Sequence, residues 1–169
     1  AERKIYYVVA WNKLYKRELF ADLRYAEGKR YEDQFLLPGL LARCKTIACL
    51  GYPGYRYVQR GGSIMAQGSS RNYLDRSEFL LEWCAYFAGK GDVLRAEGLL
   101  NDAIRNLSEK ERFDLSTKGQ QVRYRTACRG CADAYRMLAR RTGQRSMALR
   151  AFLLRLGLPV YLTFLQSRQ

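Results

Sequence analysis

The chain has 169 residues, of which 48% are hydrophobic, so it can bury a core of its own and its length does not require several domains. Its 30 basic and 16 acidic residues give a net charge of +14, and 22 of the basic residues are arginines, which favours an anionic partner. Histidine is absent, which excludes imidazole from any catalytic or metal-binding role.

The first third of the chain favours a mixture of strands and helix. Three short runs with aromatic, β-branched or alternating side chains predict strands at residues 5–9, 46–50 and 55–60. Between the first two, residues 12–20 predict a helix whose apolar anchors are Leu14, Leu19 and Phe20. We therefore predict an α/β structure for residues 1–66.

A Gly/Ser-rich break near residues 67–70 precedes a part with helical periodicity. Three apolar stripes each predict the buried face of one helix: Leu80, Cys84 and Phe87; Val93, Ala96, Leu100, Ala103, Ile104 and Leu107; Cys128, Cys131, Ala132, Tyr135, Leu138 and Ala139. Gly143 is expected to end the third helix, and residues 157–159 to break the apolar closing segment. Residues 67–169 are thus predicted to be a helical, basic C-terminal extension.

The five cysteines lack the dense, regular spacing of a secreted disulfide scaffold, so a reducing cytoplasm fits best. Cys128 and Cys131 form a single C-x-x-C pair, but a zinc site would need two further ligands that are not nearby in sequence. Because both cysteines fall on an apolar stripe, we predict that they pack in the core and bind no metal.

Positive charge is concentrated near the C-terminus. Residues 118–169 contain 11 basic residues and one acid, Asp133, which is a net charge of +10. Such a tail can face nucleic acid, anionic lipid or water, and no nucleic-acid motif accompanies it. The longest charge-free apolar stretch near the end, residues 156–166, is shorter than the ~20 residues that a membrane-spanning helix needs. We expect no membrane span.

Glu32 and Asp33 come just before the apolar run at residues 35–37. From local sequence alone, Asp33 is a candidate helix N-cap whose carboxylate accepts backbone amides. Pro38 and Gly39 are expected to interrupt the helix that follows.

Three segments carry a resemblance to a known family: W-N-K-L-Y-K-R-E-L-F at residues 11–20, Glu32-Asp33, and Y-R-Y-V-Q-R-G-G-S-I-M at residues 55–65. Their order and spacing resemble the acceptor-side half of family 2 glycosyltransferases. The resemblance implies part of a GT-A type, Rossmann-like α/β catalytic domain at residues 1–66, followed by the helical extension. The implied activity is sugar transfer from a nucleotide-sugar donor to a carbohydrate acceptor, as in bacterial surface polysaccharide assembly.

The resemblance also implies roles for the carboxylate pair. In inverting enzymes of this family, the second carboxylate is the general base, so Asp33 would take the proton from the acceptor hydroxyl. Glu32 would orient the acceptor or neighbouring cations. A helix N-terminus would help to keep Asp33 ionised.

Five further residues are implied in substrate binding. Trp11, Asn12 and Lys13 would line the floor of the acceptor cleft, where an indole stacks on a sugar face and an amide binds hydroxyls. The alternative for this segment is a buried tryptophan with a capping asparagine. Arg60 and Ser63 resemble a loop that closes over the donor diphosphate, and the alternative there is a surface arginine in a glycine-rich turn.

Donor binding in this family uses Mg or Mn held by an Asp-x-Asp motif, which the 169 residues do not contain. We therefore expect that the donor-binding half precedes Ala1 in a longer parent, that this chain binds no metal and that it is inactive alone. The expected location is the cytoplasm, peripherally at the inner face of the membrane. The alternative function is a non-catalytic, arginine-rich module that binds nucleic acid or an anionic membrane.

Overall fold

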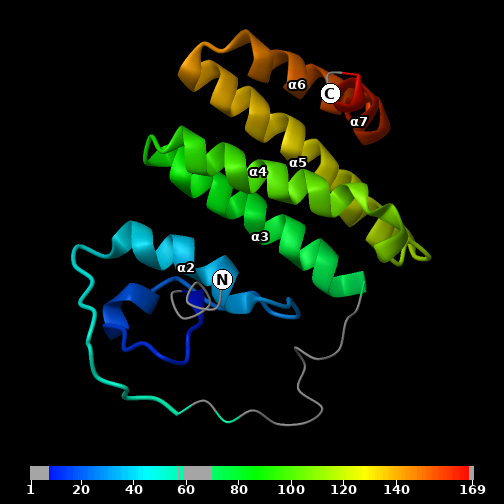
Figure 1. Ribbon diagram of the computed structural model, residues 1–169. Coiled ribbons are helices and arrows are strands. Elements are labelled where there is room, and N and C mark those ends of the chain that lie inside the picture. The colour runs from blue at the N-terminus through cyan, green and yellow to red at the C-terminus, as the bar shows by residue number, and fades with distance from the viewer. Residues whose placement is uncertain (1–7, 57, 59–69, 168–169) are drawn as a thin grey trace. The chain divides into compact units, whose positions relative to one another are not determined.

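A computed structural model describes residues 8–56, 58 and 70–167 of the chain. The chain divides into two compact units, Ala1–Gly68 and Ser69–Gln169, called here the N-terminal and the C-terminal unit (Figure 1). Each unit is considered by itself.

The predicted α/β, Rossmann-like fold is wrong, because the described residues form helices and irregular segments but no strand or sheet. Residues 46–50 are exposed and irregular instead of forming a strand. The predicted strand at residues 5–9 lies mostly outside the described residues, and that at 55–60 lies there in part. A β-branched, alternating run forms a strand only when a neighbouring strand pairs with its backbone groups, and residues 46–50 have no such neighbour among the described residues.

The described part of the N-terminal unit contains the 3₁₀-helix η2 (Arg17–Phe20) and the α-helix α2 (Glu32–Arg43). The predicted helix at residues 12–20 is therefore present only in its last four residues. Leu14, predicted to anchor that helix, is fully exposed and so contributes no burial energy to it.

Helix α2 continues through Pro38, so the predicted interruption at Pro38-Gly39 is also wrong. Proline leaves one carbonyl of the preceding turn without its helical amide. Burial of Leu36, Leu37 and Leu40 on the same helix offsets that loss. Gly39 lets the chain pass closely, since a Cβ there would lie 3.1 Å from a methyl group of Leu23.

The C-terminal unit is a bundle of five α-helices and one short 3₁₀-helix within the described residues (Figure 1): α3 (Ser70–Gly89), α4 (Val93–Ser108), η4 (Lys110–Arg112), α5 (Lys118–Thr142), α6 (Arg145–Leu156) and α7 (Leu158–Gln166). The predicted helical stripes are confirmed. Asp92 and Thr117 cap α4 and α5 by accepting the amides of Arg95 and Gln120. Gly143 ends α5 with a left-handed φ of 71°, as its position in the sequence predicts.

One apolar cluster joins the helices of the C-terminal unit; its largest fully buried members include Leu100, Leu107, Cys131, Tyr135 and Leu138. Cys131 is buried in this core and Cys128 packs against it, which confirms the core-packing prediction for the pair. Ion pairs and hydrogen bonds also join the helices of this unit. Arg123 on α5 donates hydrogen bonds to Asp75 and Glu78 on α3, at 2.6 and 2.8 Å.

No helix in the described part of the chain combines the length and the apolar character that crossing a bilayer requires.

Candidate functional site

The candidate site is built around Asp33 in the first turn of α2. The N-cap of this helix is Tyr31, in the left-handed region at φ 60° and without a side-chain capping bond. Asp33 is therefore not the N-cap, which was the alternative that local sequence offered for it. The Asp33 carboxylate instead accepts the amide of Gln34 at 2.8 Å. Non-glycine residues at positive φ carry a strain of about 1–3 kcal/mol, and such strain is often found at functional sites.

Burial raises the pKa of the half-buried Asp33 carboxyl above its usual value, and the adjacent Glu32 carboxylate raises it further. The backbone amides of Gln34 and Ala10 oppose this by donating to the carboxylate. Glu32 itself is exposed. Asp33 is therefore a carboxylate that its environment makes more basic than an ordinary aspartate, which suits a proton acceptor.

Lys13 brings the segment before η2 close to this carboxylate. Its ammonium donates to the Val9 carbonyl at 2.5 Å and to the Asn12 side-chain oxygen at 2.8 Å. Burial lowers the pKa of Lys13, and the negative charge of Asp33 partly offsets that effect. The two residues are far apart in sequence, so the fold supplies their electrostatic contact.

Two tyrosines lie within the range of the Asp33 charge. Burial raises the pKa of both Tyr15 and Tyr25, and the charge of Asp33 raises each further. Trp11 stacks on Tyr55 with ring centroids 4.6 Å apart and an interplanar angle of 30°. Since Ala10 donates to Asp33 and Trp11 follows it directly, the indole belongs to the segment that contacts the carboxylate.

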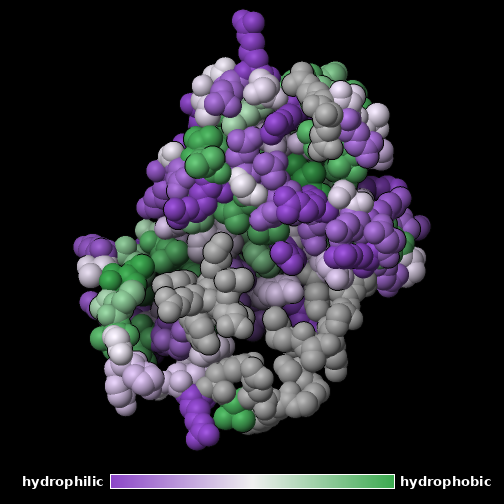
Figure 2. Space-filling model, in the orientation of Figure 1, coloured by the Kyte–Doolittle hydropathy of each residue, from purple (hydrophilic) through white to green (hydrophobic). Residues whose placement is uncertain are grey.

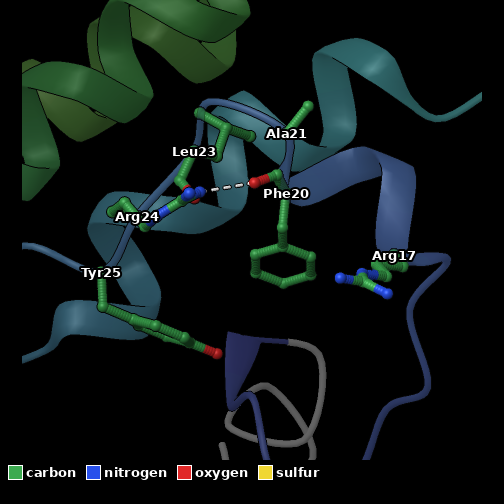
Figure 3. Close-up of a pocket in the computed structure, with 6 residues that line it drawn as sticks. All are labelled: Arg17, Phe20, Ala21, Leu23, Arg24 and Tyr25. Carbon is green, nitrogen blue, oxygen red and sulfur yellow. Dashed lines mark hydrogen bonds between the residues drawn. The ribbon is translucent and has the colours of Figure 1, made fainter.

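A hollow of about 430 Å³ lies next to this cluster and is lined by Arg17, Phe20, Ala21, Leu23, Arg24 and Tyr25. Figure 3 shows the Phe20 ring with the side chains of Arg17 and Tyr25 on either side of it. The Arg24 guanidinium donates to the carbonyls of Phe20 and Leu23 at 2.5 and 2.7 Å, which fixes this turn. Tyr25 belongs to the hollow and also lies in the field of Asp33, so it links the two.

The structure thus brings together four of the residues that the sequence nominated, Trp11, Asn12, Lys13 and Asp33, with Glu32 exposed beside them. Arg60 and Ser63 lie outside the described residues. Sequence reasoning missed Tyr15, Tyr25, Arg17 and Arg24. Tyr15 and Arg17 lie inside the 11–20 motif, so the motif itself was the signal that could have found them.

The residues present do not fit the divalent metal that the resemblance implies. In the described ranges, no group of three Cys, Asp or Glu side chains lies close enough to hold a metal ion. No chemical step is therefore assigned to a metal in this chain.

Comparisons of the chain with models of protein families, with curated proteins and with solved structures give no significant match. The likeness to family 2 glycosyltransferases therefore remains a prediction from the motifs alone.

Proposed function

We propose that the Asp33 cluster is the acceptor-binding side of a sugar-transfer site. In this proposal, Asp33 accepts the proton of an acceptor hydroxyl while that oxygen forms a bond to the donor sugar and the bond from the sugar to the nucleoside diphosphate breaks. The donor and its metal would be held by another polypeptide segment, because these 169 residues contain no Asp-x-Asp motif.

The observation that carries the proposal is that the two halves of the motif lie near each other in the fold. The backbone amide of Ala10, next to the 11–20 segment, donates to the Asp33 carboxylate, and Lys13 lies within the range of its charge although 20 positions separate the two residues. Two segments that served only two separate turns would not need this proximity. Burial of Asp33 supports the proposal as well, since a raised pKa makes the carboxylate a stronger base while leaving it in reach of solvent.

The surroundings of Asp33 suit a carbohydrate. The half-buried Trp11, which stacks on Tyr55, is of the residue type that packs on the C–H face of a sugar ring. Asn12 and Lys13, which hydrogen-bond to each other, are of residue types that bind hydroxyls. The neighbouring hollow of about 430 Å³ falls in the range of about 300–1,000 Å³ typical of small-molecule pockets. A nucleotide-sugar donor is used in the cytoplasm, and five cysteines without a disulfide fit that reducing compartment.

The direct test is saccharide binding by the whole chain, measured by saturation-transfer NMR against a panel of neutral and acidic oligosaccharides. We expect at least one saccharide to bind, and Trp11→Ala to weaken it about 10-fold or more because stacking is lost. Trp83→Phe is the matched control: Trp83 is the second of the two tryptophans, buried in α3 of the other unit, and its replacement should leave binding unchanged.

Asp33→Asn separates binding from catalysis, because an amide keeps the shape of the carboxyl but does not accept a proton. Saccharide affinity should change by less than about threefold, whereas turnover in an assay supplied with the donor-binding segment should fall about 100-fold or more. The proposal fails if no saccharide of the panel binds, if Trp11→Ala binds as tightly as the wild type, or if Asp33→Asn turns over normally.

A further inference from the structure

The exposed side of α5 carries a row of arginines. Helical spacing places Arg125, Arg129, Arg136 and Arg140 on one face, since successive members are four, seven and four residues apart. All are exposed or half-buried, and the one acid on that face is Asp133. Asp133 pairs with Arg136 and, at 3.5 Å, with Arg155 on α6. The row therefore keeps a large positive excess and extends onto α6.

Helix α6 adds apolar side chains to the same surface. Leu149, Phe152 and Leu156 recur at i, i+3 and i+7 on its outer side and are 40%, 58% and 58% exposed. Arg145 and Arg155 flank this stripe and are exposed. A hollow of about 260 Å³ lined by Arg129, Asp133 and Arg155 lies between α5 and α6, and Leu156 of the stripe follows Arg155 directly in sequence. Figure 2 shows hydrophobic residues among hydrophilic ones over the end of the C-terminal unit that α6 and α7 form.

The remaining arginine of α6 explains why the basic residues do not all share one face. Arg150 points inward, where it donates to Glu97 at 2.9 Å and to the Tyr135 hydroxyl at 3.1 Å. It is thus a structural clamp between α6 and α4, and the outward arginines remain for another role.

We propose that this α5–α6 face, formed by Arg125, Arg129, Arg136, Arg140, Arg145 and Arg155 together with Leu149, Phe152 and Leu156, binds the surface of an anionic lipid bilayer. Apolar side chains bordered by cations match the boundary between acyl chains and negative headgroups. There the apolar side chains leave water and the cations lie beside negative charges, and both effects favour binding. Binding would leave the helices lying on the bilayer, in keeping with the absence of a spanning helix in the described residues.

Two other occupants fit the face less well. A nucleic acid would engage the arginine row through its phosphates but would leave Phe152 and Leu156 in water. A second copy of the chain could cover the apolar stripe, but it would place two arginine rows of like charge against each other. An anionic lipid surface alone uses the charge and the apolar stripe together.

Co-sedimentation of the full chain with vesicles tests the proposal. Vesicles of phosphatidylcholine mixed with phosphatidylserine are compared with phosphatidylcholine alone, at low and at high salt. We expect binding to the mixed vesicles to be about 10-fold tighter or more and to weaken with salt, because each basic residue near an anionic surface adds to the affinity.

Two variants divide the face into its parts. Phe152→Glu should lower binding to both kinds of vesicle about 10-fold, and Arg129→Gln with Arg136→Gln should lower binding to the anionic vesicles by a similar factor. Leu94→Glu and Arg105→Gln are the matched controls, since both residues are exposed on α4, outside the face, and should leave binding unchanged. Circular dichroism verifies that each variant is folded.

The proposal is overturned by equal binding to neutral and anionic vesicles, by unchanged binding of the face variants, or by tighter binding of a random-sequence DNA duplex than of anionic vesicles. Sedimentation of a dimer that Phe152→Glu dissociates would instead assign the stripe to a second copy and would also overturn it. None of these outcomes bears on saccharide binding at Asp33, so the two proposals succeed or fail separately.

Discussion

The two units of the chain use their residues differently. In the C-terminal unit, one buried apolar cluster runs through the helices from Leu74 to Tyr161. In the described part of the N-terminal unit, the buried apolar side chains are those of Val9, Leu36, Leu37 and Leu40 with Pro38. That same part holds a set of ionisable groups, the half-buried Lys13, Tyr15 and Asp33 and the exposed Tyr25, whose pKa values all depart from their usual values.

This difference indicates a division of roles. Burying apolar surface stabilises a fold, and the buried carboxylate of the C-terminal unit, Asp75, is paired with Arg123. The Asp33 carboxyl has a raised pKa because burial outweighs the amides that it accepts, and such a group opposes stability and is often found where a protein carries out chemistry. We therefore expect substitutions in the C-terminal unit to change stability strongly, and substitutions around Asp33 to change function with small effects on stability.

The largest stability effect is expected at Arg123. Its guanidinium pairs with Asp75, a carboxylate that is fully buried, so Arg123→Ala removes a positive charge that offsets a buried negative one. We expect a loss of about 3–5 kcal/mol in the free energy of unfolding, measured by urea denaturation. Arg125→Ala, at an exposed position on the same helix, should change it by less than about 0.5 kcal/mol. Equal urea midpoints for the two variants would contradict the buried clamp.

Leu100→Ala tests whether the units are independent. Leu100 is fully buried on α4, so its truncation should destabilise the C-terminal unit by about 3 kcal/mol. The two tryptophans report the units separately: Trp11→Phe leaves Trp83 in α3, and Trp83→Phe leaves Trp11 in the N-terminal unit.

The urea midpoint followed by Trp83 fluorescence should fall in Leu100→Ala, and the midpoint followed by Trp11 should stay where it was. Leu94→Ala, an exposed leucine on the same helix, is the control and should move neither. A parallel shift of both midpoints would show that the chain unfolds as one cooperative body. That result would contradict the expectation that the two units differ in how substitutions affect their stability.

The smallest change in stability is expected at two glycines, Gly119 in α5 and Gly143 at its C-cap. At Gly143 the backbone is left-handed and no atom lies within 4 Å of an added Cβ, so Gly143→Ala should lose about 1 kcal/mol through backbone strain alone. Gly119 stands in the first turn of the same helix with equally open space, and Gly119→Ala should gain up to about 1 kcal/mol through helix propensity. Thermal unfolding of both variants measures the difference; shifts of the same sign would contradict the assigned end of α5.

The same contrast explains what the sequence could predict. The stripes from Val93 to Leu107 and from Cys128 to Ala139 identified their helices because each helix buries one face of its own periodic pattern. The strand at residues 46–50 failed because a strand depends on a partner elsewhere in the chain, which local pattern does not reveal. The break at Pro38 failed because burial of the neighbouring leucines outweighed the missing hydrogen bond.

For the site, motif resemblance nominated Asp33, Trp11, Asn12 and Lys13 but could not place them relative to one another. The approach of Lys13 to Asp33 depends on the path of the chain between residues 13 and 33, which no periodicity encodes. The N-cap expectation for Asp33 failed for a related reason, since Tyr31 takes the cap position in a left-handed conformation that a tyrosine rarely adopts.

The central claim is that Asp33 is kept as a buried carboxylate for its chemistry and at a cost to stability. Because the folded state raises its pKa, the folded state binds the proton more tightly than the unfolded state, so the ionised carboxylate opposes folding above that pKa and the penalty disappears as the pH falls through it. Asparagine has no charge to bury.

The most direct test is the melting temperature of Asp33→Asn and of the wild type followed across acid and neutral pH by Trp11 fluorescence, with Trp83 replaced by phenylalanine in both. The account predicts that the Asn variant is the more stable of the two at neutral pH and that the gap closes in acid, where Asp33 is protonated. An Asn variant that is less stable at neutral pH, with the gap closing in acid, would show that the charge stabilises helix α2 and would contradict the account.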